Sequence, residues 1–210
     1  MKKRPPVSNI RREYGASTLE ESQVSADPIL QFEAWLHDTV QSELHDPTAM
    51  VLSTVDAQGF PDSRVVLLKG IEAGCFVFYT NYESNKGLQI EHNPKVALNF
   101  YWPSLARQVR IRGIIEKIAT QQSDEYFASR PYSSQLSALL SPQSRVLSER
   151  ADLLERFELH LKKQSPLKRP AHWGGYLVKP IEIEFWQGRD NLYMTEFNIF
   201  SKIQNGVFVA

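Results

Sequence analysis

The sequence predicts a mainly β fold with helices packed outside, and three observations support this prediction. Short apolar runs recur at close spacing, turn residues separate most of them, and no strand–helix alternation typical of a parallel doubly wound sheet is found. The chain has 210 residues, of which 42% are hydrophobic and 23% charged, so it can bury one proper core. We therefore expect an antiparallel barrel.

The first part of the chain predicts an arm followed by a helix. Residues 1–25 are polar, contain prolines and lack an apolar period, so we expect them outside the core. Residues 26–210 would form the barrel domain. Asp27 can cap a helix that has Pro28 in its first turn. The apolar positions of this helix are Ile29, Phe32, Trp35, Leu36 and Val40.

The rest of the chain alternates short strands with a few helices. Strands are predicted over residues 50–55, 64–69, 75–80, 96–102 and 109–118, and again near Leu177 and over 181–186. Helical stretches are predicted over residues 84–91, 121–129 and 147–163.

Composition excludes several classes of protein. Lys and Arg together number 24, as do Asp and Glu, so no global field draws the chain to nucleic acid or membrane. Cys75 is the only cysteine, so an intrachain disulfide and a cysteine metal cluster are excluded, and the five histidines lack metal-ligand spacing. The start of the chain lacks the apolar stretch of a signal peptide, and no run approaches the roughly 18 apolar residues of a membrane span. A cytoplasmic protein without a metal site is expected.

The most informative strand is bracketed by two cations. Its apolar residues are consecutive, which predicts that both faces are covered. Arg64 and Lys69 are five residues apart, which predicts that they lie on opposite faces. Either both side chains reach solvent at the strand ends, or each meets an anion, and two faces would then mean two anions. The strand consists of Arg64, Val65, Val66, Leu67, Leu68 and Lys69.

Two further cations lie near predicted helix ends. Ser84 can cap the helix that follows it, which places Lys86 in the first turn, where a cation opposes the helix dipole unless an anion is bound there. Tyr126 and Arg130 are four residues apart on one helix face, and Arg130 with Ser134 could hold a phosphate. The alternatives are a solvated lysine and a surface arginine near a helix end.

These stretches together resemble the pyridoxamine 5′-phosphate oxidase family from Arg11 to about Arg189. The resemblance depends on several short segments in the family's order and spacing. They are Arg11-Arg12-Glu13-Tyr14, residues 64–69, Tyr79-Thr80-Asn81, Gln108-Val109-Arg110, residues 126–131, Gln143-Ser144-Arg145, Trp173-Gly174-Gly175-Tyr176 and residues 184–188.

The resemblance implies an FMN-binding split β-barrel that forms a homodimer, with the flavin at the subunit interface. It implies that Arg64 and Lys86 hold the flavin phosphate, with Gln143 and Ser144 supplied by the partner subunit. The other flavin contacts would come from residues 65–69 and from Tyr79, Thr80, Asn85, Gln108 and Trp186. The substrate phosphate would be held by Lys69, Tyr126, Arg130 and Ser134, with the arm residues Arg11, Arg12, Glu13 and Tyr14 closing over the substrate.

The reaction implied is the oxidation of pyridoxamine 5′-phosphate or pyridoxine 5′-phosphate to pyridoxal 5′-phosphate. A hydride would leave the carbon that bears the amine or alcohol and pass to the flavin, and O2 would then reoxidise the flavin with release of H2O2. Because the cofactor supplies this chemistry, no protein residue is assigned as a catalytic acid or base.

The chain departs from the family pattern in two places. Asn85 stands where the family usually has Arg, so we expect weaker flavin binding. The second departure is the tail, where the family continues with Arg-Leu-His-Asp-Arg and this chain has Leu192-Tyr193-Met194-Thr195-Glu196. Codons exist for which one added base near the Asn191 codon restores that motif and a later Trp. Our hypothesis is that residues 192–210 are encoded out of frame.

Two other functions remain open from the sequence. One is a flavin-binding split-barrel protein that acts on another substrate, and the other is a catalytically impaired protein that retains flavin or pyridoxal phosphate. The arm residues and the predicted substrate-phosphate group distinguish the oxidase from the first of these.

Overall fold

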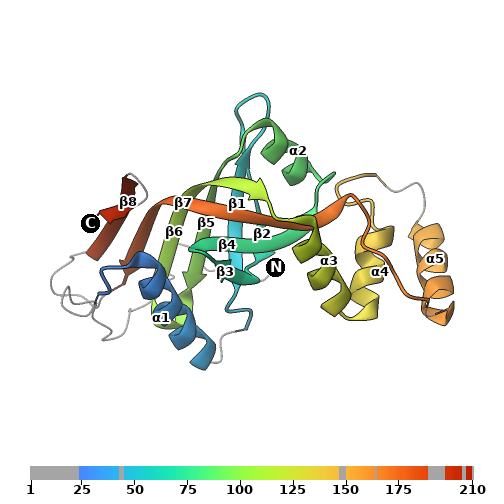
Figure 1. The fold of residues 1–210 in the computed structure, drawn as a ribbon, viewed down its shortest axis with the longest axis horizontal. Coiled ribbons are helices and arrows are strands. Elements are labelled where there is room, and N and C mark those ends of the chain that lie inside the picture. Colours follow the sequence, from blue (N-terminus) through green and yellow to red (C-terminus); the bar gives the residue numbers. More distant parts are fainter. Residues whose placement is uncertain are drawn as a thin grey trace, which may run out of the picture. The chain divides into compact units, whose positions relative to one another are not determined.

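The fold is built on strands whose order differs from their order in the sequence. The structure is a computed structural model that describes residues 24–42, 45–146, 150–163, 165–188, 197–204 and 207–209, the last two segments as backbone only. Hydrogen-bonded neighbours follow the order β2-β1-β5-β6-β7-β4-β3, and β8 pairs with β7 and β9 (Figure 1). The chain divides into two compact units, and strands β5 (Lys95–Trp102), β6 (Arg107–Lys117) and β7 (Trp173–Gln187) contribute to both.

One unit, residues 48–99 and 111–182, contains two antiparallel hairpins. Strands β1 (Ala49–Val55) and β2 (Pro61–Leu67) pair from Ala49↔Leu67 to Val55↔Pro61. Their turn is fixed by Asp56, whose carboxylate accepts the backbone N–H groups of Gln58 and Phe60. Strands β3 (Gly70–Glu72) and β4 (Cys75–Asn81) form the second hairpin, and β4 also pairs with β7 from Phe76↔Val178 to Asn81↔Trp173.

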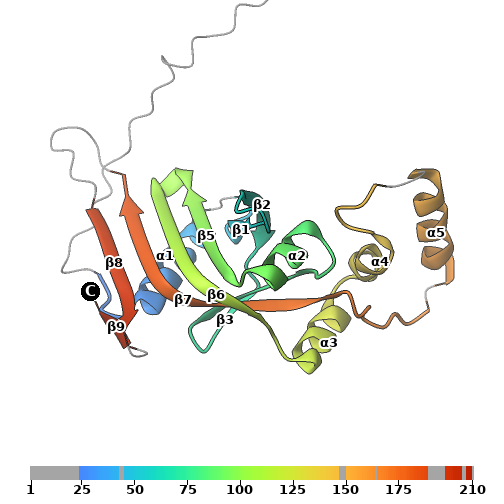
Figure 2. The ribbon, with the colours of Figure 1, turned by 90° about the horizontal axis from the view of Figure 1, so that it is seen from above.

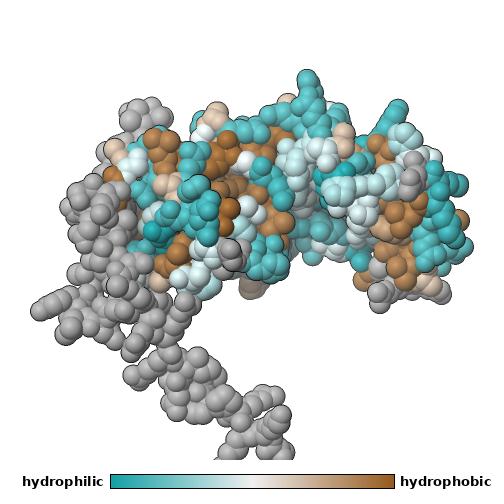
Figure 3. Space-filling view, turned by 90° about the horizontal axis from the view of Figure 1, so that it is seen from below, coloured by the Kyte–Doolittle hydropathy of each residue, from teal (hydrophilic) through white to brown (hydrophobic). Residues whose placement is uncertain are grey.

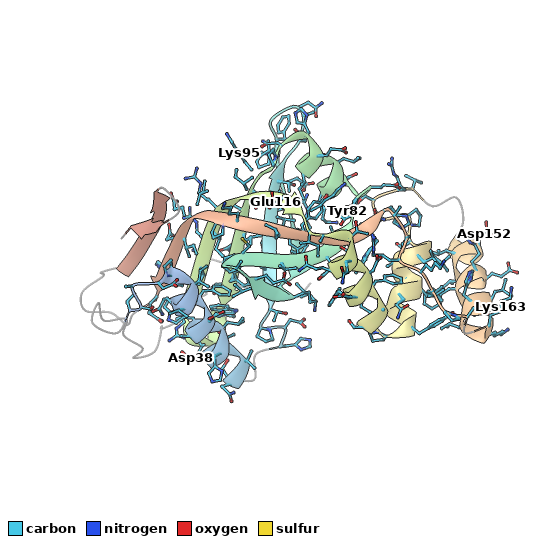
Figure 4. All side chains as sticks on the ribbon, in the orientation of Figure 1. Asp38, Tyr82, Lys95, Glu116, Asp152 and Lys163 are labelled. Atoms are coloured by element: carbon cyan, nitrogen blue, oxygen red, sulfur yellow. The ribbon has the colours of Figure 1, made fainter. Side chains whose placement is uncertain are left out.

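Four helices lie in the described part of this unit. They are α2 (Asn85–His92), α3 (Thr120–Ser129), α4 (Tyr132–Leu140) and α5 (Arg150–Lys163), and the last three lie in a row in Figures 1 and 2. Asp152 and Lys163, labelled in Figure 4, lie in the first and last turns of α5, where their charges complement the helix dipole.

The other unit, residues 1–47, 100–110 and 183–210, packs α1 (Pro28–Gln41) on aromatic side chains. Asp27 caps α1 by accepting the N–H of Ile29 at 2.8 Å. The Phe32 ring lies edge-on to Phe100, and the Trp35 ring lies edge-on to Phe185. The unit also contains a short 3-10 helix (Pro103–Leu105) and strands β8 (Phe197–Gln204) and β9 (Val207–Val209).

Most predicted elements are confirmed, with boundaries shifted by a few residues. The sequence did not indicate β3 or α4, and it divided the single long strand β7 into two. Val40 was expected on the apolar face of α1, but it is 50% exposed. Both faces of the strand after Arg64 were expected to be covered, but Val65 is 65% and Leu67 39% exposed, because both residues line a cavity.

The described helices include none that is long and apolar enough to cross a membrane. Within the same residues, no group of three His, Cys, Asp or Glu side chains is placed to hold a metal ion.

Candidate functional site

A cavity of about 430 Å³ lies within the unit that contains the two hairpins, and this volume is in the range of small-molecule sites. Its walls come from β2 and the residues that follow it, from β4, α2 and α3, and from the segment after α4. The lining residues are Arg64, Val65, Val66, Leu67, Lys69, Tyr79, Thr80, Lys86, Tyr126, Arg130, Gln143, Ser144 and Trp173.

The first group of polar residues in this cavity is formed around a buried lysine. Lys86 is 8% exposed, and its Nζ donates to Ser84 Oγ at 3.2 Å and to Gln143 Oε1 at 3.1 Å. Burial lowers the pKa of Lys86 from its ordinary value, and the nearby positive charge of Arg64 lowers it further. The hydrogen-bond partners of Lys86 are both neutral, while Arg64 is paired with Asp62, so an anion bound here would stabilise the buried lysine.

The N-terminal turn of α2 positions this lysine. Ser84 accepts the backbone N–H of Gly87 at 3.4 Å and donates its hydroxyl to the carbonyl oxygen of Asn81 at 2.7 Å. A Cβ atom at Gly87 would lie 1.9 Å from the carbonyl oxygen of Tyr82, so only glycine fits this approach. The cap and the glycine together hold Lys86 at the cavity wall.

The second group of lining residues is aromatic. Tyr79 stacks on Tyr126 with ring centres 3.8 Å apart, and Trp173 lies nearly parallel to both. Burial raises the pKa of Tyr79 to about 12, and it also raises the pKa of Tyr126. Both phenols therefore stay protonated near neutral pH and can donate a hydrogen bond to a ligand.

Arg130 lies beside this aromatic group. Its guanidinium carbon is 4.6 Å from the centre of the Trp173 ring. Its Nη1 atom is buried and has no hydrogen-bond partner among the described residues. Burial lowers the pKa of Arg130, which shows that its charge is poorly solvated. A ligand oxygen would supply the missing acceptor.

A smaller cavity of about 240 Å³ shares Arg130, Tyr79 and Trp173 with the first. It extends along α4 toward Ser137 and Ser141. Tyr82, labelled in Figure 4, donates its hydroxyl to the carbonyl oxygen of Gly175 at 3.1 Å and so ties the loop before α2 to β7.

The structure brings together most of the residues that the sequence singled out. Arg64 to Leu67, Lys69, Tyr79, Thr80, Lys86, Tyr126, Arg130, Gln143 and Ser144 all line the larger cavity. Leu68, Asn85 and Ser134 are not among its lining residues, and Gln108 and Trp186 belong to the other unit. Arg11, Arg12, Glu13 and Tyr14 lie outside the described residues, as does the tail segment 192–196.

One expectation about these residues is wrong. Arg64 and Lys69 were expected on opposite faces of one strand, but β2 ends at Leu67, so Lys69 lies outside the strand that carries Arg64. The reason is that Leu68 N donates to Thr48 O while Lys69 N donates to Val77 O, so the chain passes from one strand partner to another between them. Gln143 and Ser144 of a partner subunit were expected at the flavin phosphate, which stays a prediction; within this chain, Gln143 Oε1 accepts from Lys86 Nζ and Ser144 lines the same cavity.

Sequence reasoning missed the role of one site residue, Trp173. Its Trp-Gly-Gly segment supported the family resemblance and was expected to lead into a strand, but Trp173 was given no role in the site. A Cβ atom at Gly174 would lie 2.2 Å from the Tyr82 hydroxyl, and one at Gly175 2.2 Å from Ile118. The available signal in the sequence was the pair of glycines directly after the tryptophan, because glycine lets other groups come close to the backbone.

Solved structures define the class of fold. PhzG from Burkholderia lata matches with a TM-score of 0.85 at 22% identity, covering 92% of this chain and 96% of its own. A pyridoxamine 5′-phosphate oxidase-related, FMN-binding protein from Nostoc punctiforme matches with a TM-score of 0.69 at 16% identity, covering 89% and 97%. This chain therefore has the split-barrel fold of these proteins.

Sequence comparison identifies the family. The family model described as pyridoxamine 5′-phosphate oxidase matches residues 36–158, and the model of the pyridoxine 5′-phosphate oxidase C-terminal dimerisation region matches residues 173–193. A pyridoxine/pyridoxamine 5′-phosphate oxidase of Legionella pneumophila is 55% identical over 193 residues, covering 91% of this chain and 90% of the relative. The chain belongs to the pyridoxamine 5′-phosphate oxidase family.

Proposed function

We propose that this chain is an FMN-dependent oxidase of pyridoxamine 5′-phosphate and pyridoxine 5′-phosphate. In this reaction O2 is consumed, and pyridoxal 5′-phosphate and H2O2 are released; with the amine substrate, water is also consumed and ammonia is released. The observation that carries the proposal is a cavity lined by four cations, Arg64, Lys69, Lys86 and Arg130, which we assign to two groups because the reaction requires two phosphate-bearing molecules to lie side by side. The Legionella pneumophila relative is named for this activity, and the 55% identity extends over 90% of its length.

The first group of cations suits the phosphate of FMN. Arg64 and the buried Lys86 line the cavity beside Gln143 and Ser144, and an anion there would relieve the repulsion between the two positive charges. The cavity volume of about 430 Å³ can hold a large part of a flavin. When bound, the flavin supplies the hydride acceptor.

The second group suits the phosphate of the substrate. Lys69 and Arg130 line the same cavity, and Arg130 offers a buried Nη1 that lacks an acceptor. Tyr126, on α3, lines the same cavity and can donate its phenolic hydrogen. These residues bind and orient the substrate, while the stacked rings of Tyr79 and Trp173 exclude water from one wall of the cavity.

We also propose that the enzyme is a homodimer. The matched dimerisation region supports this, as do apolar side chains that remain exposed on α5, which include Leu154 and Leu159. Figure 3 shows apolar residues at the surface in the part of the molecule formed by α4 and α5. Exposed apolar area of this kind marks surfaces that associate.

A steady-state assay on purified protein reconstituted with FMN tests the function. We expect a yellow dimer that consumes O2 when pyridoxamine 5′-phosphate is added and releases equimolar H2O2 and pyridoxal 5′-phosphate. A protein that binds FMN but turns over neither phosphate ester would indicate another substrate or an impaired enzyme. A colourless protein that cannot be reconstituted would refute the flavin assignment itself.

A further inference from the structure

Arg64 belongs to a closed ring of four side chains, three of which lie outside the cavity lining. Its Nη1 donates to Thr54 Oγ1 at 2.6 Å, and its Nη2 forms an ion pair with Asp62 Oδ2 at 2.6 Å. Thr54 in turn donates to Gln89 Oε1 at 2.5 Å, and Gln89 Nε2 donates to Asp62 Oδ2 at 3.2 Å. A further hydrogen bond crosses the ring, from Arg64 Nη2 to Gln89 Oε1 at 3.2 Å.

Three secondary-structure elements build this ring. The β1–β2 register places Thr54 opposite Asp62 and Leu52 opposite Arg64, so alternate residues of the hairpin present all of these groups on one face. Gln89 comes from α2, three residues after Lys86, and so lies one helical turn beyond it. The helix that supplies one cation of the site therefore also supplies the amide that holds the other.

The ring and the carbonyl oxygen of Leu52 together accept the four terminal N–H groups of the Arg64 guanidinium. Nη1 has acceptors in Thr54 Oγ1 and Leu52 O, and Nη2 has acceptors in Asp62 and Gln89. An arginine side chain has five N–H donors, so the Nε–H remains for a ligand. With its plane and terminal nitrogens fixed, Arg64 has already lost the rotamer freedom that binding an anion would otherwise cost.

The geometry points to Thr54 and Gln89 as positioning residues, which hold Arg64 in the orientation that receives the flavin phosphate. Neither residue lines the cavity, so each acts on the ligand only through Arg64. Asp62 closes the ring and balances part of the positive charge that Arg64 and Lys86 bring together. This inference rests on the proposed function, in which Arg64 binds the phosphate of FMN.

The test compares two flavins that differ only by the phosphate. Fluorescence titration of the flavin-free full-length protein with FMN and with riboflavin gives a ratio of affinities that measures recognition of the phosphate. Thr54 is 1% exposed, and Thr54→Val keeps its shape but removes the hydroxyl, whereas Thr54→Ser keeps the hydroxyl. Gln89→Met keeps the length of the half-buried side chain and removes the amide.

We expect Thr54→Val and Gln89→Met to lower FMN affinity by about tenfold each while riboflavin affinity stays unchanged, since each loses a hydrogen bond to a charged group. Thr54→Ser should restore most of the preference for FMN. A merely structural role would lower the affinities for both flavins together. That result, or unchanged FMN affinity in both variants, overturns the positioning role.

A double-mutant cycle separates this inference from the proposed function. In an Arg64→Ala background, Thr54→Val should have no further effect on FMN affinity, because the guanidinium that Thr54 positions is absent. If Arg64→Ala weakens FMN binding but the ring variants do not, only the positioning role fails. If Arg64→Ala leaves the preference for FMN unchanged, the phosphate assignment and the ring both fail.

Discussion

The guanidinium carbon of Arg130 lies 4.6 Å from the centre of the Trp173 ring. A cation in this position is attracted by the negative face of the indole, and the attraction grows when water is excluded. Arg130 follows α3 and Trp173 begins β7, so the contact joins the two elements at the cavity wall. The Trp173 indole therefore fixes Arg130, whose buried Nη1 has no acceptor among the described residues.

This contact predicts that Trp173 controls substrate affinity. We expect Trp173→Leu to raise the KM for pyridoxamine 5′-phosphate by about 3- to 30-fold, the range of a partly buried cation–π contact. Trp173→Phe keeps an aromatic face and should lose much less. Steady-state kinetics with measured flavin content decides the matter, because an equal loss of flavin in both variants would mean that the residue is structural.

Lys86 predicts a pH dependence for flavin binding. Its pKa lies below the ordinary value of 10.5 because of burial and Arg64, and a bound phosphate raises that pKa again. FMN therefore binds best when Lys86 is protonated, and its affinity should fall as the pH rises through the lowered pKa, at a pH below the ordinary lysine value. Arginine does not deprotonate in this range.

Titrations of FMN between about pH 7 and 10 measure this effect. The matched variant is Lys86→Arg, which should bind FMN with an affinity that stays flat over the alkaline range. Riboflavin should show no such fall in the wild-type protein. If wild-type and Lys86→Arg proteins lose FMN in parallel as the pH rises, Lys86 does not contact the phosphate.

Local features of the site could be predicted from the sequence because they depend on neighbouring residues alone. The Ser84 cap and the place of Lys86 in the first turn of α2 follow from helix geometry, and the structure has both. Tyr126 and Arg130 were predicted on one helix face in the same way; both line the cavity, although α3 ends at Ser129 and Arg130 follows it as the C-cap.

Features that depend on distant strands could not be predicted in this way. The opposite-face prediction for Arg64 and Lys69 assumed one continuous strand, whereas β2 ends at Leu67 and Lys69 already bonds to Val77 on β4. Thr54 and Gln89 carry no motif of their own. Only the β1–β2 register and the packing of α2 bring them to Arg64.

The close approach at Gly87 predicts a loss of stability and of flavin together. A Cβ atom there would lie 1.9 Å from the Tyr82 carbonyl oxygen, so Gly87→Ala must move the first turn of α2, which carries Lys86. Overpacking of this kind costs about 1–3 kcal/mol. We expect a Tm lower by about 3–10 °C and weaker FMN binding, measured by thermal unfolding and titration.

Gly70→Ala is the matched control for this prediction. A Cβ atom at Gly70 meets nothing within 4 Å, and its backbone does not have a positive φ. The Tm and FMN affinity of this variant should stay close to those of the wild type. Equal behaviour of the two variants would show that α2 accommodates the added methyl group without moving Lys86.

The tail gives a prediction about activity. The match to the dimerisation region ends at residue 193, within the segment 192–196 that departs from the family motif. Of the tail, the structure describes only the backbone of β8 and β9, so this prediction depends on the sequence. If Leu192 and Met194 replace the family's Arg and His, the chain lacks a cation and a hydrogen-bonding ring at the substrate.

We therefore expect the chain to bind FMN but to oxidise pyridoxamine 5′-phosphate slowly. Each lost contact of this kind costs on the order of 2–4 kcal/mol of transition-state stabilisation, or about 30- to 1000-fold in rate. A version with the reading frame restored from position 192 should recover kcat/KM by at least about tenfold, with FMN affinity measured alongside. Resequencing the source gene is an independent check, because the hypothesis requires one missing base near the Asn191 codon. A gene that encodes Leu192-Tyr193-Met194, together with turnover equal to that of the frame-restored version, would show that neither the frameshift nor these positions explain activity.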